Sequence, residues 1–259
     1  MGMSRLLLVA RQGLRKEAER MQVTLIGHST VLLEMDGARI LTDPYFGTWG
    51  NPAYRRLTPP ALPREDLKDV DLVLVSHNHF DHTDRQYFSA LPGHVPVVAP
   101  ARVKWLIKLR GARNVRGMRA WEAQRFDSVE VTAVPALHMA VTLGFVIRCG
   151  GEQVYFAGDT FYRPFMAEIG KRFQLDLALI PVTTFRIPMT MGEKGAVRAV
   201  QELKPSTVIP IHLGLQPRSP LMRTGHSPEG FRSRLREAGI DTTVAILGEG
   251  ERWQSEGHR

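Results

Sequence analysis

The stretch Val70-Asp71-Leu72-Val73-Leu74-Val75-Ser76-His77-Asn78-His79-Phe80-Asp81-His82 passes directly from apolar residues into three histidines and an aspartate. A short run rich in Val and Leu predicts a buried strand, and the polar residues follow at its carboxyl end. Open α/β sheets usually bind their ligands at that end of the strands. The stretch therefore predicts a strand that leads into a binding site.

The residue types that follow this strand suit a metal ion. Imidazole nitrogens and a carboxylate, with no thiolate, suit Zn, Fe or Mn and argue against a structural zinc of the cysteine type. His77 and His79 are two positions apart, so on an extended backbone they face the same side and can hold one ion together. Asp81 and His82 follow where the chain must turn and can diverge toward a second ion. We therefore expect a metal site rather than a loop that is merely polar.

The spacing of these ligands resembles a known family. His77-Asn78-His79-Phe80-Asp81-His82 matches the HxHxDH signature of the metallo-β-lactamase superfamily, and the resemblance runs from about Val23 to the end of the chain. Five further segments come in the family's order: Gly27-His28-Ser29-Thr30, Thr42-Asp43-Pro44, Pro135-Ala136-Leu137-His138, Gly158-Asp159-Thr160 and Pro210-Ile211-His212. Together they look like the branch that holds the ascorbate-6-phosphate lactonases and the N-acyl-phosphatidylethanolamine phospholipase D enzymes.

This resemblance implies a fold and a ligand set. The fold would be α/β (α+β), a four-layer αββα metallo-β-lactamase sandwich, whereas periodicity alone indicates only a mixed α/β chain. Seven side chains would hold two divalent ions: His77, His79 and His138 the first, Asp81, His82 and His212 the second, and Asp159 both. Zinc is the favoured metal, with Mn or Fe as alternatives.

The implied activity is metal-dependent hydrolysis. Two ions about 3.5 to 4 Å apart can share a bridging hydroxide and generate this nucleophile near neutral pH. Asp81 and Asp159 are the catalytic candidates, because Asp159 would bridge the ions and Asp81 can hydrogen-bond the bridging water as a base or orienter.

Other polar residues near the predicted site are candidates for supporting roles. Asp43 would orient a ligand through a hydrogen bond, and a turn-forming Asp-Pro is the alternative. Arg186 follows a predicted strand end and could contact an anionic group, although solvent exposure is equally expected. For His226, a loop that leads into a helix is favoured over a place in the pocket. We interpret His28 as a buried, hydrogen-bonding histidine rather than a ligand.

The net charge and the composition of the chain limit the classes of substrate that we expect. The chain carries 34 Lys and Arg against 26 Asp and Glu, a net charge of +8, which favours anionic partners. We expect a small-molecule or lipid anionic substrate, either a phosphodiester or a lactone. Nucleic acid is disfavoured because no arginine tract interleaved with aromatic residues is present. A nucleic-acid-processing hydrolase (nuclease) remains the alternative, and a non-catalytic metal-binding scaffold is the third hypothesis. Met139 and Phe161 depart from the phospholipase-like pattern and predict a different pocket.

The 259 residues predict one main domain, 21–259, preceded by a basic amphipathic extension at 1–20. The apolar part of this extension is too short for a secretory signal or a membrane span. A packing helix or a tail is favoured over peripheral contact with an anionic membrane. The one cysteine, Cys149, is expected to be a small buried residue and is compatible with a reducing compartment, so we expect a cytoplasmic protein, with membrane association as the alternative.

Periodicity predicts the remaining elements. A change to period two predicts an antiparallel meander over 23–26, 31–34 and 38–42. Residues 44–66 have no clear period and predict a long loop, which either forms a wall of the pocket or plugs the surface. Further strands are expected at 95–99, 129–134, 142–148, 153–157, 175–181 and 208–211. Helices are expected at 84–91, 102–109, 194–204 and 228–238.

Overall fold

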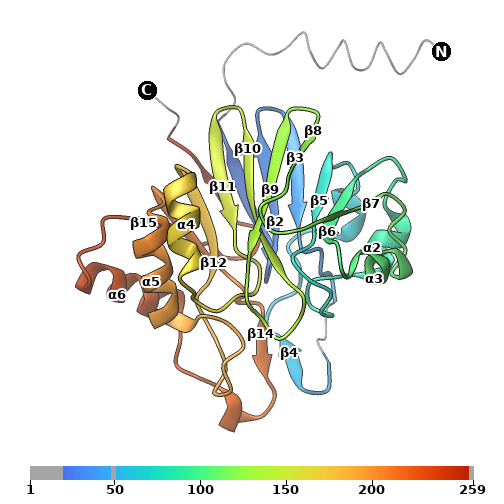
Figure 1. Ribbon diagram of the computed structural model, residues 1–259. Coiled ribbons are helices and arrows are strands. Elements are labelled where there is room, and N and C mark those ends of the chain that lie inside the picture. The colour runs from blue at the N-terminus through green and yellow to red at the C-terminus, as the bar shows by residue number, and fades with distance from the viewer. Residues whose placement is uncertain (1–19, 48–50, 257–259) are drawn as a thin grey trace, which may run out of the picture.

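The computed structural model describes residues 20–47 and 51–256, so all of the predicted extension except Arg20 lies outside the described residues. Two seven-stranded sheets pack face to face, and helices cover both outer faces (Figure 1). This is the predicted four-layer αββα sandwich. Among the described helices, none is both long enough and apolar enough to span a membrane.

The first sheet contains the predicted meander. In spatial order its strands are β16 (Arg252–Gln254), β1 (Gln22–Gly27), β2 (Thr30–Met35), β3 (Ala38–Thr42), β5 (Leu72–Leu74), β6 (Val97–Pro100) and β7 (Val115–Met118). Strands β1, β2 and β3 are antiparallel, whereas β3, β5, β6 and β7 run parallel. Helices α2 (Arg85–Ala90) and α3 (Lys104–Leu109) belong to this half. Strand β5 is the buried strand that the opening stretch predicts.

The second sheet repeats this arrangement of an antiparallel part joined to a parallel part. Its strands, in spatial order, are β15 (Thr243–Val244), β13 (Thr207–Ile211), β12 (Leu177–Pro181), β11 (Glu152–Phe156), β10 (Leu143–Cys149), β9 (Val129–Pro135) and β8 (Ala123–Phe126). Strands β11, β12, β13 and β15 are parallel. Helices α4 (Phe165–Arg172), α5 (Gly192–Leu203) and α6 (Pro228–Glu237) cover it. The predicted hairpin of β10 and β11 is confirmed.

Alternation of side chains along β5 explains why the whole strand is apolar. Leu72 and Leu74 belong to the core between the two sheets, together with residues such as Phe145. Val73 and Val75 point the other way, into the core that the first sheet forms with α2 and α3. A strand buried on both faces has no polar side, as parallel strands under helices require. Cys149 is buried between the sheets, as expected.

Several short elements differ from the prediction. Residues 44–66 include β4 (Tyr54–Arg56) and a 3-10 turn at Arg64–Leu67, and β4 pairs with β14 (Leu215–Pro217). Strands β7, β8, β15 and β16 and helix α4 were not predicted either. Strands of two to four residues are too short to show a period, and partners far away in the sequence supply their backbone hydrogen bonds.

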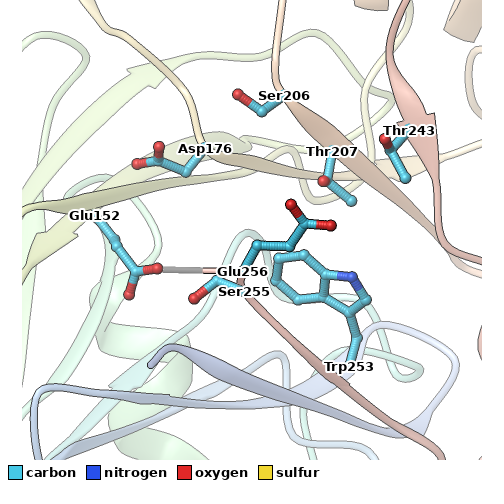
Figure 2. A pocket seen from close by; sticks show the side chains of 8 residues that line it. All are labelled: Glu152, Asp176, Ser206, Thr207, Thr243, Trp253, Ser255 and Glu256. Atoms are coloured by element: carbon cyan, nitrogen blue, oxygen red, sulfur yellow. The ribbon is translucent and has the colours of Figure 1, made fainter. Parts of the chain in front are cut away.

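The parallel strands give the sandwich two different edges. The amino ends of β11, β12, β13 and β15, together with the segment at β16, line a hollow of about 270 Å³ whose side chains include Glu152, Asp176 and Glu256 (Figure 2). No histidine is among the described residues that line it. The candidate ligands instead follow the carboxyl ends of β5, β9, β11 and β13, so the metal site must be sought at the opposite edge.

Candidate metal centre

The first group of candidate ligands is His77, His79 and His138, whose nearest nitrogens lie within 4.8 Å of one another. The Nε2 atom of His138 is 3.3 Å from Nδ1 of His79. On its other side, Nδ1 of His138 lies 2.9 Å from the carbonyl oxygen of Met189. Donation of Nδ1–H to this carbonyl leaves Nε2 as the unprotonated nitrogen, which is the arrangement found in metal-binding histidines. These three residues can therefore hold one ion.

The second group joins the HxHxDH loop to two other strand ends. Asp81, His82, His212 and also His28 place one ligand atom each within 4.8 Å of the others. The Nδ1 atom of His82 lies 2.6 Å from Oδ2 of Asp43, so its Nε2 is free to face an ion. The fully buried His28, which the sequence suggested was only a hydrogen-bonding histidine, has its Nε2 3.4 Å from Oδ2 of Asp81.

Asp159 lies between the two groups. Its Oδ2 is 3.1 Å from Nε2 of His212 and 3.5 Å from Nε2 of His82, both in the second group. The same oxygen is 3.7 Å from Nε2 of His138 in the first group. One carboxylate thus reaches both groups of ligands.

Asp43 holds the HxHxDH loop in place through hydrogen bonds. Its two carboxylate oxygens accept hydrogen bonds from the backbone N–H and the hydroxyl of Ser76, each at 2.6 Å, in addition to the contact with His82. The hydroxyl of Ser76 is also 2.9 Å from Nδ1 of His77. A single buried carboxylate therefore orients one histidine of each group, directly for His82 and through Ser76 for His77.

Unusual backbone conformations support this convergence. His28, Asp43 and His212 have φ values of +59°, +33° and +65°, in the left-handed region that disfavours side chains. The backbone N–H of His212 donates to the carbonyl of His28 at 2.9 Å, which ties two of these strand ends together. Such strained residues persist only where the surrounding structure holds them, and they concentrate at functional sites.

Gly158 is required for the close approach of two strands. Its φ is +55°, and a Cβ at this position would lie 2.4 Å from Cβ of Ser76. Glycine thus lets β11 come near the end of β5, which places Asp159 beside the histidines.

Burial keeps most of the imidazoles neutral. It lowers the pKa of His77, His79 and His138, so these rings are unprotonated near neutral pH and able to bind a metal. For His28, burial and the neighbouring His212 lower the pKa to about 3. His82 behaves differently, because the carboxylates of Asp159, Asp43 and Asp81 outweigh burial and raise its pKa well above the usual value.

The carboxylates of Asp159 and Asp81 stay ionised. Burial opposes ionisation of Asp159, but His212 and His82 outweigh it and hold its pKa well below the usual range. For Asp81, burial is likewise outweighed by His82 and by the contact with His28, so its pKa is lowered. Two carboxylates in one buried cluster require compensating positive charge, which a divalent cation supplies.

The residues fit a metal by a second criterion, the state of their buried polar atoms. The Nε2 atoms of His77, His82 and His212 and Oδ1 of Asp159 are buried and have no hydrogen-bond partner among the described residues. Each buried polar atom without a partner costs about 1 to 3 kcal/mol. All four are atoms that can ligate a metal, so bound cations would satisfy them.

A cavity of about 220 Å³ opens over these ligands. His79, Asp81, His138, Asp159 and His212 form its polar side. Apolar side chains form the rest, and two of them, Tyr54 and Phe185, come from segments to which sequence reasoning assigned no definite contact.

Two other candidates do not line this cavity. Arg186 is exposed, and its backbone N–H donates to the carbonyl of Met222. His226 is half-buried beside Gly192, directly before α6, and borders a neighbouring hollow. The sequence analysis did not include His28 in the ligand set. One signal could have found it: His28 directly follows the end of β1, and the other candidate ligands also follow strand ends.

Comparisons with known proteins show the family and the fold of the chain. The sequence pattern described as Beta-lactamase superfamily domain matches residues 38–213. A UPF0173 metal-dependent hydrolase of Methanopyrus kandleri is 30% identical over 246 residues, covering 90% of this chain and all of that protein. One of Thermus thermophilus is 33% identical over 237 residues, covering 88% of this chain and 97% of the relative.

Among solved structures, Igni18, a metallo hydrolase from the archaeon Ignicoccus hospitalis, has a similar fold, with a TM-score of 0.76 and 24% identity. The similarity covers 92% of this chain and 99% of Igni18. The matched pattern includes the seven predicted ligands, whereas His28 lies before its first residue, and the relatives match over nearly their whole length. The chain therefore belongs to the metallo-β-lactamase superfamily and, with its UPF0173 relatives, to the metal-dependent hydrolases of that superfamily.

Proposed function

We propose that the protein is a dinuclear metal-dependent hydrolase. In this proposal His77, His79 and His138 hold one ion, Asp81, His82 and His212 hold the other, and Asp159 binds both. The observation that carries it is the position of Asp159, whose Oδ2 lies within 3.7 Å of Nε2 atoms from both groups. The donor set of nitrogen and oxygen suits zinc best, with Mn or Fe as alternatives.

The bound ions, Asp81 and His28 have separate roles in the proposed reaction. Bound divalent ions would lower the pKa of a water molecule and stabilise the charge that develops on the scissile group. Asp81 lines the cavity and is ionised, so its carboxylate can accept a hydrogen bond from the attacking water and orient it. Its lowered pKa makes it a better orienter than a proton acceptor. His28, 3.4 Å away, positions that carboxylate.

The proposed substrate is a phosphodiester or a lactone. Both contain an electrophilic centre that a hydroxide can attack. Both also have an oxygen that becomes more negative in the transition state, which a metal ion at this site could stabilise. A cavity of about 220 Å³ holds a small group rather than a polymer, which supports a small-molecule or lipid substrate over a nucleic acid.

The experiment compares loss of a ligand with loss of an equivalent exposed residue. We expect His79→Ala and Asp159→Ala to abolish metal-dependent hydrolysis of bis-p-nitrophenyl phosphate and of a panel of lactones. His94→Ala and Asp241→Ala replace exposed residues of the same types and should keep the wild-type rate. Unchanged turnover in both ligand variants would exclude the metal mechanism.

Metal content tests the dinuclear part independently. Elemental analysis after reconstitution should give about two ions per chain for the wild type and fewer for Asp159→Ala. A content below one ion per chain would favour a scaffold that does not catalyse hydrolysis. A full complement of metal with no turnover on any substrate would have the same consequence.

A further inference from the structure

Five of the side chains that line the cavity over the candidate ligands are apolar or aromatic, and we call them the wall. They are Tyr54, Phe80, Phe185, Met189 and Leu215. All except the buried Leu215 are partly exposed, so their surfaces remain available for contact with a bound molecule. A cavity that combines apolar side chains with a few polar groups is the usual design of a site that binds an apolar group and orients it with a few polar contacts.

This wall is held in place by pairing between distant segments. Strand β4 pairs with β14, which puts Tyr54 opposite Pro217 and Arg56 opposite Leu215. The ring of Tyr54 stacks on that of Phe185, with 5.1 Å between centroids and 28° between planes. Phe80 belongs to the HxHxDH loop itself, so the wall and the ligands share a segment. The wall is therefore a built surface and not a chance grouping of exposed side chains.

The loop that carries Phe185 also positions His138, one of the candidate metal ligands. The hydroxyl of Thr184 accepts hydrogen bonds from the backbone N–H groups of Met189 and Thr190, at 2.8 and 3.2 Å. Met189 in turn presents its carbonyl to Nδ1 of His138 at 2.9 Å. An apolar group bound against Phe185 would consequently occupy a fixed position relative to the ligands.

The positive side chains described near this cavity have other partners or are exposed to solvent. No lysine or arginine is among the described residues that line it. Arg56 lies over the ring of Tyr45 and donates to the carbonyl oxygens of Thr58, Tyr45 and Gly47. Arg55 donates to Oε1 of Gln216 at 2.7 Å, and Arg186 is exposed. Among the described residues, none that lines the cavity offers a Lys or Arg side chain to an anionic group of the substrate beyond the reacting centre.

We propose that the wall formed by Tyr54, Phe80, Phe185, Met189 and Leu215 is a specificity subsite for an uncharged aliphatic or aromatic group of the substrate. This inference rests on the proposed function and narrows it to esters or lactones with an apolar substituent in preference to phosphodiesters with a second charged group. Cavities of about 150 Å³ with apolar walls hold benzene. A volume of about 220 Å³ thus accommodates one ring or a short chain.

The test uses probes that bind metal without being hydrolysed. Acetohydroxamate, butanohydroxamate and hexanohydroxamate have the same metal-binding head and differ only in chain length. Their dissociation constants are measured by calorimetry on the metal-loaded full chain. Affinity should rise roughly fourfold for each buried methylene until the cavity is full. Affinity that is independent of chain length would overturn the proposal.

Two variants in the same loop distinguish loss of the subsite from effects that any apolar-to-serine substitution in the loop would have. Phe185→Ser should reduce the affinity ratio of hexanohydroxamate to acetohydroxamate toward one. Ile187→Ser changes an apolar residue two positions away that is 61% exposed and does not line the cavity, and it should keep the wild-type ratio. Equal ratios in the two variants would remove Phe185 from the subsite, and the conservative change Phe185→Leu should restore most of the gain.

A charged probe tests the second half of the proposal. A hydroxamate with the same chain but a terminal carboxylate should lose the gain that the chain provides, because no cation receives it. Binding as tight as that of hexanohydroxamate would contradict an uncharged subsite. These results are independent of turnover: a gain with chain length in a protein that hydrolyses nothing refutes the proposed function alone, whereas hydrolysis without the gain refutes this inference alone.

Discussion

Replacement of Gly158 by alanine tests how closely the two sheets must approach to form the site. Gly158 has a φ of +55°, a conformation that costs an L-residue about 1 to 2 kcal/mol. The new Cβ would also lie 2.4 Å from Cβ of Ser76. Relief of such an overlap in a packed region typically costs about 1 to 3 kcal/mol. We therefore expect Gly158→Ala to lower the free energy of unfolding by roughly 2 to 5 kcal/mol.

Gly151→Ala is the matched control. Gly151 also has a positive φ, +89°, but a Cβ added there would meet no atom within 4 Å. Only the backbone cost applies, so the two variants should differ by the overlap alone, about 1 to 3 kcal/mol. Urea unfolding of the metal-free proteins, with equal m values, measures this difference.

Gly158→Ala should also weaken metal binding, because Ser76 contacts two residues of the site. Its hydroxyl contacts both Asp43 and His77, so a displaced Ser76 should weaken metal affinity in Gly158→Ala by about 10- to 100-fold. Competition with a chelator measures this affinity, and Gly151→Ala should match the wild type. If the two variants agree within about 0.5 kcal/mol in stability and bind metal equally, the close approach is not what positions the site.

Two further predictions concern the hydrogen bonds and charges around the ligands. Asp43→Asn should lower metal affinity about 10- to 100-fold, since the amide accepts hydrogen bonds less well from His82 and Ser76, whereas the exposed Asp241→Asn should have no effect in the same chelator competition. The metal-free protein should lose stability as pH falls below about 6.5, because the unfolded chain then binds protons that buried histidines such as His28, with its pKa of about 3, do not accept. Each such histidine contributes up to about 1.4 kcal/mol per pH unit. The raised pKa of His82 does not offset this loss, because its contribution is complete below pH 6.5 and fades only as pH rises. A urea midpoint that stays constant from pH 6.5 to 5 would contradict the prediction.

Patterns within one segment were enough to predict the central elements of the fold. The meander of β1, β2 and β3 and the hairpin of β10 and β11 follow from alternation and from turn residues, which act between neighbours in the chain. The buried strand β5 follows from its continuous apolar run. The superfamily also follows from one segment, since the HxHxDH loop carries its spacing in six consecutive residues.

The tertiary structure decided which distant residues complete the site. Residues such as His28 and Asp159 gain their positions from strand ends that meet only after the two sheets pack, and the left-handed backbone at His28 cannot be read from an isolated segment. The same holds for the wall of the cavity. Arg55 and Gln216, whose side chains join β4 to β14, are 161 positions apart, so no local period reveals this pairing.

The sequence by itself thus determined the chemistry of the ligands, the strand that delivers the first of them, and the superfamily. The resemblance implied that Asp159 binds both ions, but only the tertiary structure gave its distances to the two groups of ligands. Only the tertiary structure decided that His28 lies beside Asp81 and that apolar side chains line the same cavity as the ligands. The physical reason is that residue type and periodicity are local properties of the chain. Distances between ligands, and the shape of the space above them, depend on the packing of two sheets whose contacts join residues far apart in the sequence.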